Sequence, residues 1–288
     1  MKFIKLIRPK QWFKSSFVLA PLIFSGLFSL ELFLVSTKYI FIFILISSCI
    51  YIFNDMMDLE YDKQHPEKIK RPLASGDISF SEASFYLALL LSISCLSVYY
   101  FQITYTGMCL VFGYLVINIL YSLGLKNIPL LELAILSSGF VIRLLFGAIE
   151  MKIELSPWII LCSGLLALMI AVGKRRSDLE QLSTQNSVTR RSLRGYSLEF
   201  LDQVNTLLAS VTIMSYLLFS TSTYALNSIG NGVLWTAPFV IFSILRYLQL
   251  VSVNKQGDDP TSMLLGDNIT IILFSIWLIL FTSIIYLS

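Results

Sequence analysis

Three aspartates in one short stretch of the chain have the spacing needed for metal-dependent phosphate chemistry. Asp55, Asp58 and Asp62 stand at positions i, i+3 and i+7, directly after a long apolar run. At about 100° per residue, these offsets predict three carboxylates on one face of a helix. Like charges on one face repel, so a cation must lie against them, and hard divalent cations with oxygen ligands are the usual solution. We therefore predict that these aspartates bind Mg²⁺, which commonly also holds phosphate oxygens. The alternative is a solvated loop between two membrane spans.

The composition predicts an all-α protein embedded in a membrane. Of the 288 residues, 56% are hydrophobic, which is far more than in an ordinary soluble domain. Nearly every apolar run could cross about 30 Å of hydrocarbon as a helix, and backbone that meets lipid must be helical. The four cysteines all lie inside apolar runs and indicate no disulfide framework. A single histidine excludes a metal site built from several histidines.

The apolar runs divide the chain into about nine transmembrane helices within one domain, 1–288. Residues 1–16 are basic and partly amphipathic, which indicates an interfacial helix that leads into the bilayer. No soluble second domain, and no partner such as nucleic acid, is indicated. The predicted spans are 17–35, 38–54, 82–101, 104–123, 128–149, 157–173, 204–226, 232–253 and 268–287.

The positive charges assign sides to these spans. With the N-terminus inside, the outer loops carry only Lys38 and Lys152, whereas the inner segments carry nearly all the other lysines and arginines. This asymmetry is what the positive-inside rule requires. Two inner loops, 55–81 and 174–203, are long and rich in charge. We therefore expect a membrane protein whose catalytic loops face the cytoplasm.

The second long loop begins with a cluster of bases and one acid. If the helix continues through GKRRSDLEQ, Lys174 and Asp178 are i, i+4 neighbours on its surface, and Arg175 is the next residue around the helix. One interpretation is a membrane anchor with a surface ion pair. The other is a clamp in which Lys174 and Arg175 hold phosphate and Asp178 faces a metal ion.

Further candidate substrate-binding residues lie in or beside the spans. Arg143 stands deep inside an apolar run, where a charge is costly and by default indicates a functional site, although a structural ion pair is the alternative. Tyr121 and Lys126 lie at the inner end of the fourth span, where both could donate to phosphate or merely anchor the interface. Lys14 could line the mouth of the site or attract anionic lipid.

The first aspartate motif resembles that of a known family. NDMMDLEYD matches the Asn-Asp-x-x-Asp-x-x-x-Asp motif of the UbiA family of intramembrane prenyltransferases, and YSLGLK is similar to the family's tyrosine-bearing element. The resemblance covers essentially the whole chain. It implies helices around a central cavity that opens to lipid, with inner loops as a cap. It also implies that Asn54 takes part in substrate binding beside Asp55, Asp58 and Asp62, which would be catalytic and hold Mg²⁺.

Other stretches resemble one branch of that family. RPKQWFKS, HPEKIKRPLASG, GFVIR and GKR are similar to the branch named for decaprenyl-phosphate phosphoribosyltransferase. The resemblance implies transfer of 5-phosphoribose from phosphoribosyl pyrophosphate (PRPP) to a polyprenyl phosphate, with release of diphosphate, for cell-envelope polysaccharides. It also brings Lys70 and Arg71 into the substrate site. Lys174 and Arg175 stand where aromatic-acceptor enzymes keep a second aspartate pair, and extra phosphates favour such cations.

Two other functions are alternatives for a membrane protein with these acidic and basic motifs. A UbiA-type prenyltransferase would join a polyprenyl diphosphate to an aromatic acceptor such as 4-hydroxybenzoate, and the basic second motif argues against it. A transporter would place its coupling site near the midplane on broken helices, whereas these acids lie at the inner interface. The oligomeric state is left open, and membrane lipids are the expected surroundings.

Overall fold

Every regular element of the described chain is helical, as predicted. The computed structural model describes residues 2–64, 68–184, 191–230, 232–253, 263 and 266–287. Eight helices in this part are long and apolar enough to cross a membrane. They are α3 (Leu30–Met57), α5 (Phe80–Tyr100), α6 (Tyr105–Leu123), α7 (Leu131–Met151), α8 (Pro157–Thr184), α9 (Leu198–Ser220), α11 (Ala237–Val253, preceded by the turn η5, Val233–Thr236) and α13 (Asn268–Leu287).

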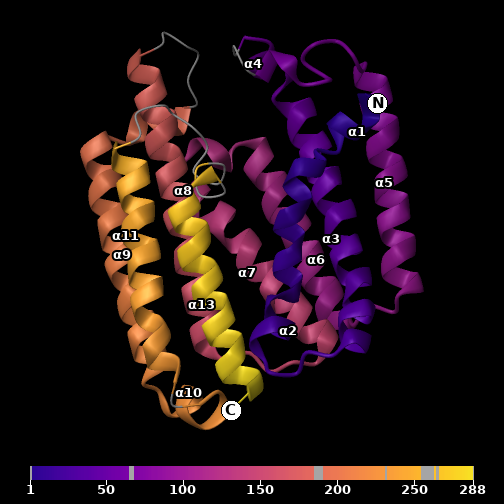
Figure 1. Cartoon of the computed structure of the whole chain (residues 1–288). Coiled ribbons are helices and arrows are strands. Elements are labelled where there is room, and N and C mark those ends of the chain that lie inside the picture. The colour runs from indigo at the N-terminus through magenta and orange to yellow at the C-terminus, as the bar shows by residue number, and fades with distance from the viewer. Residues whose placement is uncertain are drawn as a thin grey trace.

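The first predicted span, 17–35, is wrong. After α1 (Lys2–Leu6), the segments η1 (Pro9–Leu19) and α2 (Ala20–Phe24) run from the end of the bundle where the N-terminus lies to the opposite end (Figure 1). The chain then turns, with Gly26 at φ 75°, and Ser29 caps α3 by accepting a hydrogen bond from the backbone N–H of Leu32. Hydropathy stays high through this turn, so it cannot separate the two passes. The glycine and the N-cap serine are the local signals for the turn.

The second long loop is shorter than predicted. Helix α8 continues to Thr184, and α9 already begins at Leu198. The apolar pattern ends near Gly173, but the charged residues that follow have good helix propensity and continue the same helix. The N-terminus, α4 (Leu59–Lys63) and the last turns of α8 lie at one end, called the N-terminal end below, and the C-terminus lies at the other (Figure 1).

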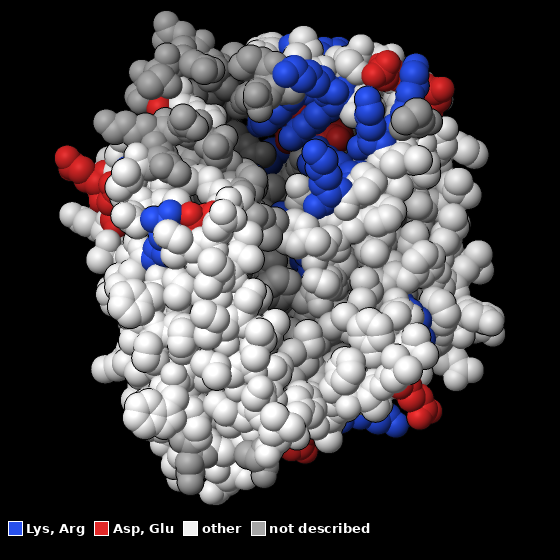
Figure 2. Space-filling model, viewed as in Figure 1, with Lys and Arg blue, Asp and Glu red and all other residues white. Residues whose placement is uncertain are grey.

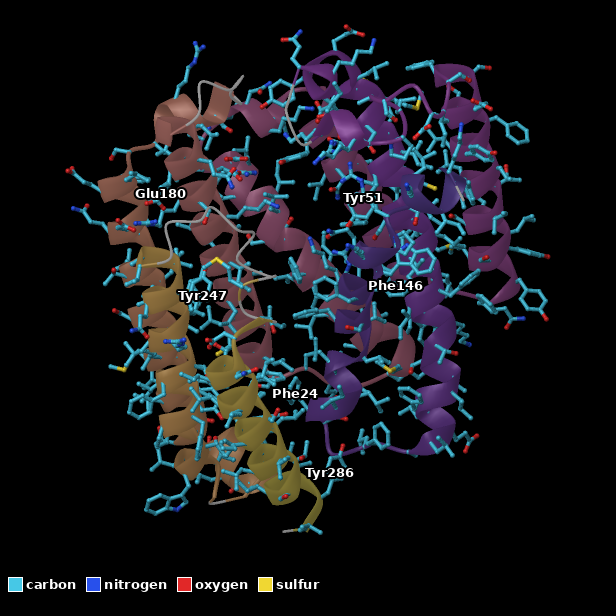
Figure 3. All side chains as sticks on the ribbon, turned by 45° about the horizontal axis from the view of Figure 1, so that its top comes forward. Phe24, Tyr51, Phe146, Glu180, Tyr247 and Tyr286 are labelled. Carbon is cyan, nitrogen blue, oxygen red and sulfur yellow. The ribbon has the colours of Figure 1, made fainter. Side chains whose placement is uncertain are left out.

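Four apolar clusters form the core of the described chain, and two of them, one in each half of the molecule, meet at α7. In the first, Phe43 and Phe146 meet with ring centroids 4.9 Å apart, and α3, α6, α7 and η1 all contribute. In the second, Leu133 and Tyr247 pack with residues of α8 and α9. Figure 3 labels Phe146 and Tyr247 in the two halves. Helix α7 contributes to both clusters, so the clusters fix the relative positions of the helix ends that carry the charged residues.

Gly147 lets η1 approach α7 closely. A Cβ atom at this position would lie 2.0 Å from the carbonyl oxygen of Val18, which is a backbone atom and has little freedom to move. We expect Gly147→Ala to lower the free energy of unfolding by about 1–3 kcal/mol, as overpacking does. Gly113→Ala is the matched control, because nothing lies within 4 Å of that position and alanine favours helix. Thermal unfolding in detergent measures both, and equal midpoints would contradict the close approach.

Candidate active site

The three motif aspartates lie where α3 ends, but they do not stand on one continuous helix. Helix α3 ends at Met57, Asp58 follows as its C-cap, and α4 begins at Leu59. The backbone N–H of Asp58 still donates to Asn54 at 2.9 Å, and that of Asp62 donates to Asp58 at 2.8 Å. The predicted single helical face is therefore split into two directions.

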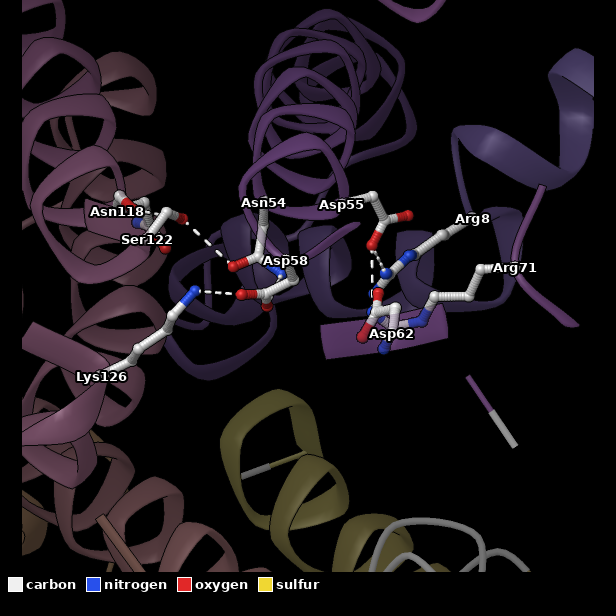
Figure 4. A network of polar contacts seen from close by, with 9 residues as sticks. All are labelled: Arg8, Asn54, Asp55, Asp58, Asp62, Arg71, Asn118, Ser122 and Lys126. Carbon is white, nitrogen blue, oxygen red and sulfur yellow. Dashed lines mark hydrogen bonds and ion pairs between the residues drawn. The ribbon is translucent and has the colours of Figure 1, made fainter. Parts of the chain in front are cut away.

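Asp55 and Asp62 share one arginine. Nη1 of Arg71 donates to Oδ1 of Asp55 at 3.1 Å and also to Oδ2 of Asp62, and Arg8 makes a second ion pair with Asp55 (Figure 4). Both aspartate side chains are almost fully buried. Arg8 is presented by a left-handed backbone (φ 50°) directly after α1. The predicted site residues Asp55, Asp62 and Arg71 are thus brought together.

Asp58 points the other way, toward α6 and η3 (Leu125–Asn127). Lys126 donates to its Oδ1, and the side-chain amide of Asn54 donates to its Oδ2 at 3.2 Å (Figure 4). Ser122 in turn donates to the side-chain oxygen of Asn54 at 3.2 Å. Ser122 and Asn118 were missed by sequence reasoning, although two polar residues four apart in an apolar helix are a usable signal. Asn54 and Lys126, both predicted to bind substrate, therefore lie beside Asp58.

The three carboxylates have the oxygen ligands that a hard divalent cation prefers, but each of them forms an ion pair with a lysine or arginine. Across the described ranges, no group of three acidic, histidine or cysteine side chains is gathered closely enough to hold a metal. Asp62 nevertheless keeps a buried Oδ1 without a hydrogen-bond partner. Mg²⁺ is commonly held by one or two carboxylates together with substrate phosphate oxygens. The donor set therefore fits Mg²⁺ that arrives with a phosphate, once a cation such as Arg71 turns toward that phosphate.

A second polar cluster joins α7 and α8 at the same end. Nε of Arg175 donates to Glu132 at 2.7 Å and Nη1 donates to Asp178 at 2.6 Å. Arg175 and Glu132 are buried, whereas the side chain of Asp178 is 35% exposed. Tyr121 lies within electrostatic reach of Arg175. Arg175 therefore holds the carboxylate of Asp178 beside the buried Glu132.

Tyr196 completes the second cluster and was not predicted. Its hydroxyl accepts a hydrogen bond from the backbone N–H of Leu130 at 2.6 Å and lies beside Glu132. Burial raises the pKa of Tyr196, so the phenol keeps its proton at neutral pH. Nothing in the local sequence indicates this contact, because 64 residues separate Tyr196 from Glu132.

The remaining predicted residues have different settings. Lys174 and Lys70 are exposed, and Lys14 is half-buried on η1. Arg143 is buried far below the aspartates, among α3, α6 and α7. Arg176, which follows Arg175 on α8, forms ion pairs with Glu180 and Asp202.

Figure 2 shows a hollow at the N-terminal end, with lysine and arginine side chains gathered on its right-hand side.

Comparison with known proteins identifies the family. The sequence model of the UbiA prenyltransferase family matches residues 15–279. The chain belongs to this family. Two relatives named decaprenyl-phosphate phosphoribosyltransferase are similar over 99% of the chain. The protein from Mycolicibacterium smegmatis is 32% identical, with 92% of its length covered, and that from Corynebacterium glutamicum is 30% identical, with 86% covered.

Solved structures of UbiA proteins share the fold. A UbiA homolog from Archaeoglobus fulgidus bound to GPP and Mg²⁺ matches the whole chain with a TM-score of 0.70 at 19% identity, and 99% of its own length is covered. The predicted all-helical membrane fold and the predicted family are therefore confirmed. At this identity the comparison establishes the fold and leaves the choice of substrate to the site.

Proposed function

We propose that this UbiA protein transfers 5-phosphoribose from PRPP to a polyprenyl phosphate and releases diphosphate, in the synthesis of cell-envelope polysaccharide. The observation that carries the proposal is the set of ion pairs in the first cluster. Asp55, Asp58 and Asp62 are each paired with a lysine or arginine at the N-terminal end. Such a site can exchange partners when metal and phosphate arrive together. The full-length similarity to two phosphoribosyltransferases supports PRPP as the donor.

The reaction needs one bond to form and one to break. An oxygen of the acceptor phosphate attacks the anomeric carbon of the ribose, and the bond from that carbon to the diphosphate breaks, with its electron pair leaving on the diphosphate. Mg²⁺ held by one or two of the three motif aspartates together with substrate oxygens would neutralise the charge that develops on the leaving diphosphate. Arg71 and Lys126 can donate to the same phosphate oxygens, and Asn54 orients Asp58.

The second cluster would supply the opposite wall of the site. Lys174 is exposed one helical turn from Asp178, so it can reach a phosphate as a point charge. Arg175 is enclosed by Glu132 and Asp178, and a phosphate contact of its own would require one of these acids to move away. Tyr121 lies close to this group and can donate a hydrogen bond. Lys70 is exposed on η2 (Lys68–Lys70), next to Arg71, where it can reach the anionic donor from the solvent side.

The protein is an integral membrane protein, and we propose that its charged end faces the cytoplasm of a bacterial cell. The support is the concentration of lysines and arginines at that end. On a background with all four cysteines replaced by alanine, a cysteine at Glu154 should react with an impermeant maleimide added to intact cells. A cysteine at Ser75 should react only after permeabilisation. The reverse pattern would show that the orientation is inverted.

A donor screen on purified protein in nanodiscs tests the function. Labelled PRPP with a polyprenyl phosphate is compared with a prenyl diphosphate and 4-hydroxybenzoate, each with Mg²⁺ and with EDTA. We expect a phosphoribosylated lipid in the first arm, its loss in EDTA and its recovery when Mg²⁺ is added back. Product only in the prenyl arm would overturn the proposal and assign the aromatic-acceptor reaction.

A further inference from the structure

The guanidinium group of Arg143 lies inside the bundle, and no carboxylate of the described residues lies beside it. The residue is 4% exposed, and its donors reach the carbonyl of Gly139 at 2.7 Å and the hydroxyls of Ser47 at 3.0 Å and Tyr114 at 2.7 Å. Its buried Nε has no hydrogen-bond partner, and among the described residues it has no salt bridge within 4.0 Å. A buried charge is costly unless it is paired, so an anion is the missing partner.

The surroundings of Arg143 hold the guanidinium in place. Its central carbon lies 4.8 Å from the ring centroid of Tyr114, 5.4 Å from that of Phe43 and 5.9 Å from that of Phe140. A Cβ at Gly139 would lie 3.3 Å from Nη1, so the glycine leaves room for the group. Arginine has five N–H donors, and three are used by the neighbouring oxygens. Two remain for a ligand in a site from which aromatic rings exclude water.

A second cation stands on η1, one turn before a ring that packs against Phe140. Phe17 packs edge-on against Phe140 with centroids 5.0 Å apart. Lys14 stands three residues before Phe17 in a 3₁₀-helix, and three residues complete one turn, so the two side chains lie on the same side of η1. Lys14 therefore stands one turn from the ring contact between Phe17 and Phe140, and Arg143 lies over the Phe140 ring. A lysine one turn from this contact and a buried arginine beside it favour a doubly charged ligand.

The distance from the aspartate cluster suits a substrate with two anionic ends. Ser47 lies eight residues before Asp55 on α3, which is about 12 Å along the helix. Tyr51 stands midway, near Arg143 and under the guanidinium of Arg8, and Figure 3 labels it in the interior. In PRPP, nine covalent bonds separate the outermost phosphorus atoms, and a chain of that length reaches about 10 Å. A substrate held by its diphosphate at Asp55 can therefore place another phosphate near Arg143.

We infer that Arg143, assisted by Lys14, binds a phosphate monoester. This inference rests on the proposed function, in which two monoesters take part: the 5-phosphate of PRPP and the phosphate of the lipid acceptor. Either one would supply the anion that Arg143 lacks within the described residues. The Nε–H, which has no hydrogen-bond partner, can donate a charge-assisted hydrogen bond to a phosphate oxygen.

Calorimetric binding in detergent with Mg²⁺ present tests the site. The probes are ribose 5-phosphate, farnesyl phosphate and pyrophosphate, and the variants are Arg143→Met and Arg143→Lys. Arg246→Met is the control, because Arg246 also lies in a spanning helix but is already bound by both carboxylate oxygens of Asp267. We expect Arg143→Met to weaken one of the two monoesters about ten- to hundredfold, while pyrophosphate affinity changes less than about twofold. Arg143→Lys should recover part of the loss, and Arg246→Met should bind all three probes like the wild type.

The outcomes separate the possible answers. Weaker ribose 5-phosphate binding assigns the site to the donor, and weaker farnesyl phosphate binding assigns it to the acceptor. If both monoesters bind Arg143→Met as they bind the wild type, the inference is wrong. It is also wrong if all three probes weaken equally together with a lower unfolding temperature, because Arg143 then only links helices. If wild-type protein binds a monoester through Arg143 but does not turn over PRPP, the proposed function fails and this site remains.

Discussion

Asp62→Asn should lower turnover by roughly 10² or more while leaving the fold intact. The substitution removes one charge and keeps the shape of a buried side chain whose Oδ1 has no partner. A divalent cation that stabilises a leaving diphosphate contributes several kcal/mol, and each 1.4 kcal/mol is about tenfold in rate. Asp58→Asn should have an effect of the same order, because Asp58 belongs to the same set. Turnover measured at saturating PRPP and polyprenyl phosphate, over a range of Mg²⁺ concentrations, gives the loss.

Glu60→Gln is the matched control for Asp62→Asn. Glu60 lies on the same short helix, α4, but its side chain is 80% exposed and pairs with Lys63 at the surface. An exposed pair of this kind contributes little, so the control should retain nearly full activity. The metal assignment would be refuted if Asp62→Asn turned over like the control, or if it lost activity without a change in pyrophosphate binding measured with and without Mg²⁺.

The identity of the first motif could be predicted from the sequence, whereas its geometry could not. Spacing alone suggested one face for three aspartates, and the end of α3 at Met57 divides them between Arg71 and Lys126. The end of α3 is coupled to the ion pairs that the aspartates form with these cations. Those cations come from positions 8, 71 and 126, which only the folded chain brings together.

Hydropathy predicted α5, α6, α7 and α13 within three residues at each end, but it missed an end of α3, α8 and α9 by six or more residues and failed at the first span. It reports how apolar a segment is and cannot detect a reversal of direction inside an apolar run. The reversal depends on Gly26 and Ser29, two residues that barely change the average. Similarly, the bases of the second motif were recognised, but the burial of Arg175 against Glu132 was not. Forty-three residues separate that pair, so no local pattern contains it.

Arg175→Ala should be the most destabilising single substitution in the second cluster. Arg175 and Glu132 have side-chain exposures of 3% and 0%, and their ion pair is fully enclosed. Removing one partner leaves an uncompensated charge in the interior, which typically costs about 3–5 kcal/mol. The double variant Glu132→Leu with Arg175→Met should recover most of this loss, because similar apolar groups can replace a buried pair at little cost. Denaturation in detergent compares the wild type, Arg175→Ala and the double variant. A double variant no more stable than Arg175→Ala would contradict the argument.

Lys174→Ala separates the role in binding from the role in folding. Lys174 is the neighbour of Arg175 on α8 but is exposed, so its removal should leave the unfolding temperature unchanged. If it contacts a donor phosphate in the ground state as well as in the transition state, its loss should raise the KM for PRPP and leave kcat nearly constant. A charged hydrogen bond of about 1.5–3 kcal/mol corresponds to a ten- to hundredfold change. An unchanged KM in Lys174→Ala would remove this lysine from the donor site, and Arg175 would then act there only by holding Asp178.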